Sequence, residues 1–119
     1  MNRTELKKKI KIIAIELLKE KNYISSIDLL MRLNYLTKSD YEKWRFGKIE
    51  FIEKACTANL SKLNFISNNL RAISKELNLK ESRTAYMKFG KGPKIKLRFS
   101  KSNDKNIEKR YSTHHVLRK

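Results

Sequence analysis

The chain has 119 residues, of which 29 are Lys or Arg and 12 are Asp or Glu, so its formal net charge is +17. This length suits a single domain, and a hydrophobic content of 39% is enough for a modest core, which argues against wholesale disorder. The apolar runs are too short for a membrane span, no signal-peptide pattern opens the chain, and Cys56 is its only cysteine. We therefore expect a cytoplasmic protein without a disulfide or a membrane segment.

The positive charge is concentrated in the last third of the chain. Residues 80–119 hold thirteen basic and three acidic side chains, a net charge of +10, whereas residues 22–47 and 48–79 carry only +1 and +2. Coding bias toward lysine would raise glutamate as well and would not collect the imbalance at one end. The distribution predicts a surface that binds a polyanion.

The first predicted element is an amphipathic helix. Asn2 and Glu5 form a capping-box pattern, and apolar residues then recur on one helical face from Leu6 to Leu18. The lysines of this segment lie off that stripe. We expect the helix to end near Asn22 and to pack on the core, because Glu16 dilutes the cationic face that a membrane-surface helix would need.

Two short helices are predicted next, at residues 26–34 and 38–46, each after a capping residue. The short gap between them is typical of a helix-turn-helix, whose second helix enters a DNA major groove, although any small helical domain can contain such a corner. On the DNA-reading interpretation, Lys38, Glu42 and Arg45 approach base edges. Trp44 is expected in the core, with Arg45 free to contact phosphate.

A long helix is predicted over residues 48–77, where apolar residues recur with a mean step of about 3.5, as in a coiled-coil seam. It has two interpretations. The helix either packs along the domain as a scaffold, which we favour, or forms a homodimer or binds another protein through this seam.

The pattern changes to a period of two after Leu79, and predicts a β-hairpin within residues 80–101. Its strands are residues 84–89 and 94–99, joined by a turn with two glycines and a proline. The apolar residues face inward in both strands. The outer face and the flanks then carry seven cations, one tyrosine and no acid: Arg83, Tyr86, Lys88, Lys91, Lys94, Lys96, Arg98 and Lys101.

Cations of one strand face recur about 6.6 Å apart, close to the phosphate spacing of a DNA strand. The tyrosine among them can stack on a base or donate to a phosphate. Lysines also protect edge strands from aggregation, but that role does not explain the absence of acids. The hairpin is therefore interpreted as a nucleic-acid-binding surface.

Residues 102–119 are predicted to form a partly helical tail, with a short helix from about 104 to 111 and a frayed end. The adjacent His114 and His115, with Glu108 and Tyr111, are the only candidates for a nuclease centre. A zinc spacing and a glycine-rich phosphate loop are both absent from the sequence, and the carboxylates that nuclease metals need are too few here. We expect no catalysis, no metal and no cofactor.

Three short motifs resemble a pattern found in small uncharacterised bacterial basic proteins. The likeness spans residues 24 to 116 and rests on Trp44-Arg45-Phe46-Gly47, Leu97-Arg98-Phe99-Ser100-Lys101 and Tyr111-Ser112-Thr113-His114. It implies no activity, but it implies that the tail through His114 belongs to the folded unit. The order of elements is similar in part to winged-helix proteins, from which it departs because a long helix separates the hairpin from the second short helix.

The sequence thus predicts one mainly α domain, 1–119, with a helical part at 1–79 that includes the helix-turn-helix-like segment 26–46. The expected function is non-catalytic nucleic-acid binding, with duplex DNA favoured over RNA. The alternatives are an RNA-binding or ribosome-associated basic protein, an interaction subunit that binds an acidic protein surface, and a small nuclease.

Overall fold

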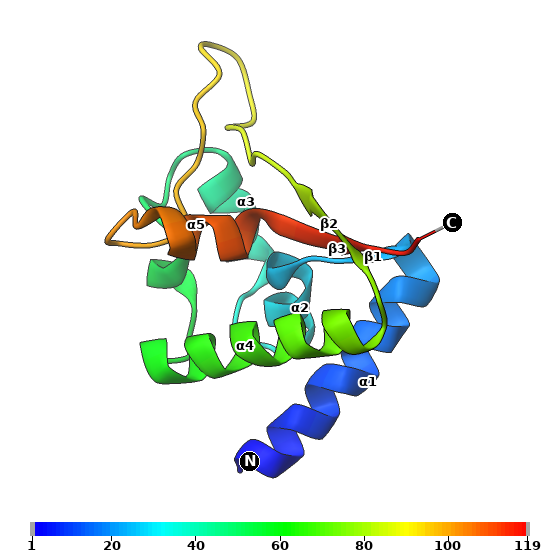
Figure 1. The fold of residues 1–119 in the computed structure, drawn as a ribbon. Helices are drawn as coiled ribbons and strands as arrows, with labels where there is room; N and C mark the ends of the chain where they lie inside the picture. The colour runs from blue at the N-terminus through cyan, green and yellow to red at the C-terminus, as the bar shows by residue number, and fades with distance from the viewer. Residues whose placement is uncertain (1, 119) are drawn as a thin grey trace.

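The computed structural model describes residues 2–118, which form five α-helices, one 3₁₀ helix and a three-stranded antiparallel sheet (Figure 1). In chain order the elements are α1 (Arg3–Lys21), β1 (Tyr23–Ile24), α2 (Ser26–Arg32), α3 (Lys38–Arg45), the 3₁₀ helix η1 (Ile52–Ala55), α4 (Leu60–Glu76), β2 (Lys80–Arg83), α5 (Lys105–Ser112) and β3 (Thr113–Val116). The prediction of a mainly helical fold is confirmed, whereas the sheet lies elsewhere than predicted.

Helix α1 has the bounds that its sequence predicts. The Asn2 side chain accepts a hydrogen bond from the Glu5 backbone N–H at 2.9 Å, and Asn22 ends the helix in the left-handed conformation, with φ of 67°. Its apolar stripe is buried: Leu6, Ile10, Ile13, Ala14, Leu17 and Leu18. These side chains share one core with the buried face of α4.

The two short helices are also confirmed. Ser25 Oγ accepts from the Asp28 N–H at 3.1 Å and Thr37 Oγ1 accepts from the Asp40 N–H at 3.0 Å, so each helix begins at a side-chain cap. Trp44 on α3 is fully buried, as expected. The two helices are joined by residues 33–37.

The predicted long helix over 48–77 is wrong. Before α4 the chain forms only η1, whose Ile52 and Glu53 N–H groups donate to the distant carbonyls of Arg98 and Phe99. Helix α4 then starts afresh after Asn59, whose side chain accepts from the Lys62 N–H at 2.8 Å. The helix breaks because these backbone and cap partners replace the i to i−4 bonds that a continuous helix would need.

The apolar residues of α4 are part of the chain's own core. Leu63, Ile66, Leu70 and Ile73 are all buried in the core that they share with α1. The periodic pattern therefore reflects intrachain packing, and the basis for a coiled-coil homodimer over 48–77 is removed.

The sheet is built around the end of the chain. Strand β3 lies between β1 and β2 and pairs with both in antiparallel register, so that His115 faces Ile24 on one side and Glu81 on the other. The expectation of a frayed tail is wrong for 113–116, because Thr113 and His115 are buried and the strand is hydrogen-bonded on two edges. The short helix before it is confirmed as α5.

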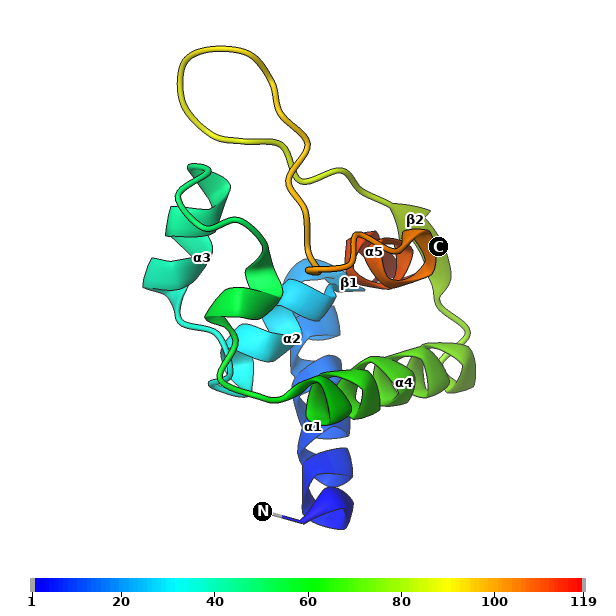
Figure 2. The ribbon, with the colours of Figure 1, turned by 90° about the vertical axis from the view of Figure 1, so that its left-hand side faces the viewer.

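Residues 84–104 connect β2 to α5, and their first part, residues 84–101, is termed the basic arm. It projects from the body of the molecule as an extended loop (Figures 1 and 2). The predicted hairpin is wrong as a regular ladder, because the only bridge in the arm pairs Met87 with Lys96. The predicted turn is present, with positive φ at Gly90 and Gly92.

The predicted inner face of the arm is confirmed only near its base. Leu97 and Phe99 are buried, whereas Phe89 and Ile95 are 42% and 51% exposed. The outer half of the arm rises beyond the sheet and α5 (Figure 2), and Phe89 packs there against the end of α3, edge-on to Phe46 at 5.7 Å.

Candidate nucleic-acid interface

An aromatic cluster fixes the base of the basic arm. The rings of Trp44 on α3, Tyr86 and Phe99 on the arm, and Tyr111 on α5 pack with neighbouring centroids 5.2 to 5.7 Å apart. The Trp44 indole N–H also donates to the Arg98 carbonyl at 2.9 Å. The arm is therefore tied to both α3 and α5 at its base, while its tip stays in solvent.

Arg45 packs against this base and is half-buried, so it is less accessible to phosphate than the sequence predicts. Its guanidinium lies over the ring of Phe89, 3.9 Å from the centroid, and over Tyr86 at 5.1 Å, and it donates to the Tyr41 hydroxyl at 3.3 Å. The Phe89 N–H donates to the Arg45 carbonyl at 2.6 Å. Arg45 thus joins the end of α3 to the arm, because a planar cation stacks well on aromatic rings.

Tyr86 is also removed from the predicted surface. It is 7% exposed, and its hydroxyl lies 2.9 Å from Nε2 of His114. The ring of His114 in turn stacks on Tyr23, with centroids 4.7 Å apart. Burial raises the pKa of Tyr86 and lowers that of His114, and both shifts favour the neutral form of the group. A base or a phosphate cannot reach the Tyr86 hydroxyl in this conformation.

Arg98 has a mixed position. Its guanidinium lies 5.4 Å from the centroid of the Phe51 ring and 3.4 Å from a Glu50 carboxylate oxygen, and its side chain is 32% exposed. It can present one edge to a ligand, but two contacts already hold it.

The other predicted site residues are accessible. Lys88 is half-buried, and the remainder are exposed: Lys38, Glu42, Arg83, Lys91, Lys94, Lys96 and Lys101. Lys38 and Glu42 lie on α3, while β2 and the arm carry the others. The structure does not bring all of them together.

A groove of about 590 Å³ lies between the second half of the arm and α5. Five cations from β2, the arm and α5 line it: Arg83, Lys96, Arg98, Lys105 and Lys109. Asn103, Asn106 and Ser112 add uncharged hydrogen-bonding groups to its wall. The groove therefore offers several phosphate-binding side chains around one concave surface.

Glu108 is the one acidic side chain of the groove wall, and its carboxylate is held by the protein itself. One oxygen accepts from the Phe99 N–H at 2.9 Å, and the other accepts from the Ser100 N–H at 2.8 Å and its hydroxyl at 2.7 Å. These hydrogen bonds shape the turn after the arm and partly offset the negative charge. The groove stays electropositive.

Some cations elsewhere on the described surface are paired with acids. Lys11 pairs with Glu76, Lys21 with Asp28, and Arg32 with Glu16 and Glu20. Within residues 2–118, none of Arg83, Lys96, Lys105 and Lys109 belongs to an ion pair. Arg98 is paired with Glu50, and unpaired lysines also lie elsewhere, so what distinguishes the groove is that its cations meet around one concave surface.

Sequence reasoning missed Lys105, Asn106 and Lys109, although a signal for them exists. Lys105 and Lys109 are four residues apart and so share one face of the predicted helix. Their meeting with Arg83 and Lys96 depends on the packing of α5 against the arm, for which the sequence carries no local signal.

A scan against protein-family models, a search of curated proteins and a search of solved structures each give no match to this chain. Within residues 2–118, no helix has the length and apolar character that would let it cross a membrane. In that same range, no three His, Cys, Asp or Glu side chains gather as a metal-binding group. The function of this chain is therefore inferred from its own geometry.

Proposed function

We propose that the protein binds nucleic acid without cleaving it, through the groove between the basic arm and α5, and that duplex DNA is preferred to RNA. The observation that carries the proposal is the groove itself. It gathers five cations from three segments, and its single carboxylate is engaged by the protein's own N–H and O–H groups. Such a surface is suited to a row of backbone phosphates.

The preference for duplex DNA is supported by the place of α3. In winged-helix proteins the hairpin directly follows the second helix of the helix-turn-helix. Here the chain passes through η1, α4 and β2 first, yet the arm returns to α3, where the Phe89 N–H donates to the Arg45 carbonyl and Phe89 packs edge-on against Phe46 at 5.7 Å. We infer that α3 and the arm act on one duplex.

On this proposal the parts have different roles. The exposed lysines of the arm and of α5 bind phosphates, while Lys38 and Glu42 on the accessible face of α3 lie near base edges. Arg45 and Tyr86 support the arm from inside, as their contacts indicate. Phosphate binding supplies most of the affinity, and α3 supplies any sequence preference.

The test compares two triple variants of equal charge. Lys96→Ala, Lys105→Ala and Lys109→Ala together remove three groove cations, whereas Lys7→Ala, Lys8→Ala and Lys19→Ala remove three exposed cations of α1. Fluorescence anisotropy is measured over a range of NaCl concentrations, with short duplex DNA and RNA of one sequence. The groove variant should weaken binding and lower the salt slope by about 0.9 for each lost phosphate contact.

Equal losses in the two variants would mean that net charge alone attracts the nucleic acid, and would contradict a binding site in the groove. Tighter binding of duplex RNA than of duplex DNA would contradict the preference for DNA. Incubation of both nucleic acids with Mg²⁺, Mn²⁺ or Zn²⁺ tests the non-catalytic part. Cleavage by the wild type that is lost in a His114→Ala, His115→Ala variant would overturn it.

A further inference from the structure

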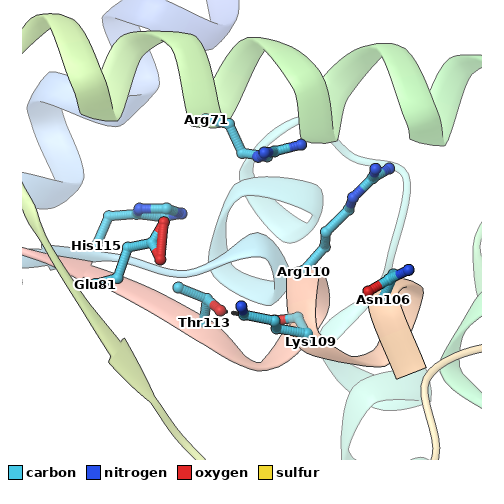
Figure 3. Close-up of a pocket in the computed structure, with 7 residues that line it drawn as sticks. All are labelled: Arg71, Glu81, Asn106, Lys109, Arg110, Thr113 and His115. Atoms are coloured by element: carbon cyan, nitrogen blue, oxygen red, sulfur yellow. Dashed lines mark hydrogen bonds between the residues drawn. The ribbon is translucent and has the colours of Figure 1, made fainter.

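A second hollow, of about 190 Å³, adjoins the groove along α5 (Figure 3). Arg71 enters it from α4, Lys109 and Arg110 from α5, and Glu81 and His115 from the paired strands β2 and β3. Two distant parts of the chain, α4 with β2 and α5 with β3, thus bring their polar side chains to one small space. We propose that this hollow binds a phosphate monoester group as its dianion.

The charge of the hollow is not balanced by the protein. Within residues 2–118, none of Arg71, Lys109 and Arg110 takes part in an ion pair, and Glu81 is the only acid among the lining residues. Burial lowers the pKa of His115, so its imidazole is neutral at physiological pH. Three cations and one carboxylate leave two positive charges uncompensated.

His115 provides a second, independent observation. The residue is 4% exposed, and its ring Nδ1 has no hydrogen-bond partner within residues 2–118. Its ring extends from β3 toward the hollow, beside Glu81 (Figure 3). A neutral imidazole carries its proton on either nitrogen, and here no protein group fixes the tautomer. The ring can therefore present an N–H to an anion in the hollow, in addition to the two arginines.

The shape and charge of the ligand follow from these groups. Arginine guanidinium groups present pairs of N–H donors that match two oxygens of one phosphate, and Arg71 and Arg110 approach from opposite walls (Figure 3). A phosphate monoester carries a charge of about −1.5 to −2 at neutral pH, close to the two charges left uncompensated. A carboxylate would offset only one of them, and the volume limits what can follow the phosphate.

Such a phosphate has two sources, and the fold links one of them to the groove. Asn106 and Lys109 line both the hollow and the groove, so a strand lying in the groove can place its terminal phosphate in the hollow. A free phosphorylated compound is the other source. The strand-end version rests on the proposed function, whereas binding of phosphate itself does not.

The first experiment uses inorganic phosphate with the ¹⁵N-labelled full-length protein. Amide shifts of the α5–β3 segment are followed by NMR at constant ionic strength, with chloride as the reference anion. We expect saturable shifts with phosphate in the wild type. The affinity for phosphate obtained from them should fall at least about tenfold in Arg71→Ala and stay unchanged in Lys8→Ala, which removes an equal charge from α1. Glu81→Gln should tighten phosphate binding, because it removes the one repelling charge.

Shifts of the same size with chloride, or equal binding by Arg71→Ala and Lys8→Ala, would overturn the proposal. Circular dichroism of each variant shows that the fold is intact, and Arg71 is exposed on α4, so its replacement leaves the core unchanged.

The second experiment separates the two sources. Wild-type protein and Arg71→Ala are titrated with single strands that differ only in a 5′-phosphate or a 5′-hydroxyl. Preference for the phosphorylated strand that Arg71→Ala abolishes assigns the hollow to strand ends. Equal affinity for both strands, with inorganic phosphate still bound, assigns it to a free phosphorylated compound. If neither these strands nor duplex DNA binds while inorganic phosphate does, the proposed function fails and the phosphate site stands.

Discussion

The Tyr86 hydroxyl lies 2.9 Å from Nε2 of His114 and joins the base of the basic arm to the central strand of the sheet. His114 is half-buried and stacked on Tyr23, while its neighbour His115 lies on the opposite face of β3 and is buried at the hollow beside α5. The two histidines therefore belong to two different surfaces, which lie on opposite faces of β3.

The stability of the fold should fall as the pH drops below about 6.5. Burial lowers the pKa of His114 and of His115 from the ordinary value of 6.5; Asp28 and Glu81 oppose the shifts, and nearby cations add to them. Below that pH the unfolded chain binds more protons at these sites than the folded chain, so protonation favours unfolding. Stability due to these shifts is fully present above the unfolded pKa and is lost as the pH falls through the folded values.

Guanidinium unfolding at about pH 7.5 and about pH 5.5 measures this change, and most carboxylates stay ionised across that range. A variant with His114→Gln and His115→Gln should show a much smaller difference between the two pH values. An equal fall in both proteins would mean that other groups cause it.

Tyr86→Phe should lower stability and leave nucleic-acid affinity unchanged. The substitution removes the hydroxyl that contacts His114 but keeps the ring in the aromatic cluster, so the cost is about 1 kcal/mol. Chemical unfolding measures the stability, and fluorescence anisotropy measures the affinity for nucleic acid. Tyr35→Phe is a suitable control, because the Tyr35 ring is half-buried outside the groove. A large loss of affinity at unchanged stability would return Tyr86 to the binding surface.

The parts of the fold that the sequence predicted well depend on local signals. Asn2, Ser25 and Thr37 each cap a helix through a backbone group three residues along, and Asp104 caps α5 within the same distance. These contacts need only a few neighbouring residues, so capping preference and apolar period are enough to find them. The prediction of α1, α2, α3 and α5 rested on them.

The errors concern contacts between distant segments. The period of 48–77 continues through the break at Asn59, because residues on both sides of it face one core, and periodicity does not show a change of axis. Tyr86 has its partner in the tail, and β3 has both of its partners far back in the chain. No local pattern signals such pairings, so the sequence does not show that Arg45 is half-buried against the arm or that Tyr86 is buried.

Leu63→Glu should unfold the protein and should not release a folded monomer. Leu63 is 4% exposed in the core of α1 and α4, so a carboxylate there loses its hydration without gaining a partner, at a cost of at least about 3 kcal/mol. Leu60→Glu is the matched control, because Leu60 is 63% exposed at the start of the same helix. A negative charge at this N-terminal position interacts favourably with the helix dipole, so the stability of Leu60→Glu should stay within about 1 kcal/mol of the wild type.

Thermal melts with light scattering follow both variants. A stable monomer from Leu63→Glu, together with a wild-type dimer, would contradict the assignment of α4 to the core and restore the interpretation of its apolar stripe as a dimer seam.

Arg45→Lys should loosen the arm although the charge is kept. A lysine cannot lie flat on Phe89 and Tyr86 as the guanidinium does, and the expected loss is about 1 kcal/mol. Faster hydrogen exchange of the Phe89 amide, which donates to the Arg45 carbonyl, should report the loosening directly. Lys43→Arg on the exposed side of α3 should change neither the stability nor the exchange rate of the Phe89 amide. Unchanged exchange in Arg45→Lys would mean that the aromatic contacts do not hold the arm.

The last prediction sets the shape of the groove against its charge. Glu108→Gln makes the groove more positive, so simple electrostatics predicts tighter binding of nucleic acid. The carboxylate, however, accepts from the Phe99 N–H, the Ser100 N–H and the Ser100 hydroxyl, and an amide would turn an NH₂ group toward one of these donors. We expect a loss of about 1 to 3 kcal/mol in stability and weaker binding, because the turn that carries the groove wall is released.

Glu50→Gln removes an equal charge from an exposed pair with Arg98, and should leave stability within about 0.5 kcal/mol while binding stays equal or tightens. Unfolding curves and anisotropy on both variants decide the matter: tighter binding by Glu108→Gln than by Glu50→Gln would show that charge alone governs the groove and that its hydrogen-bonded wall is dispensable.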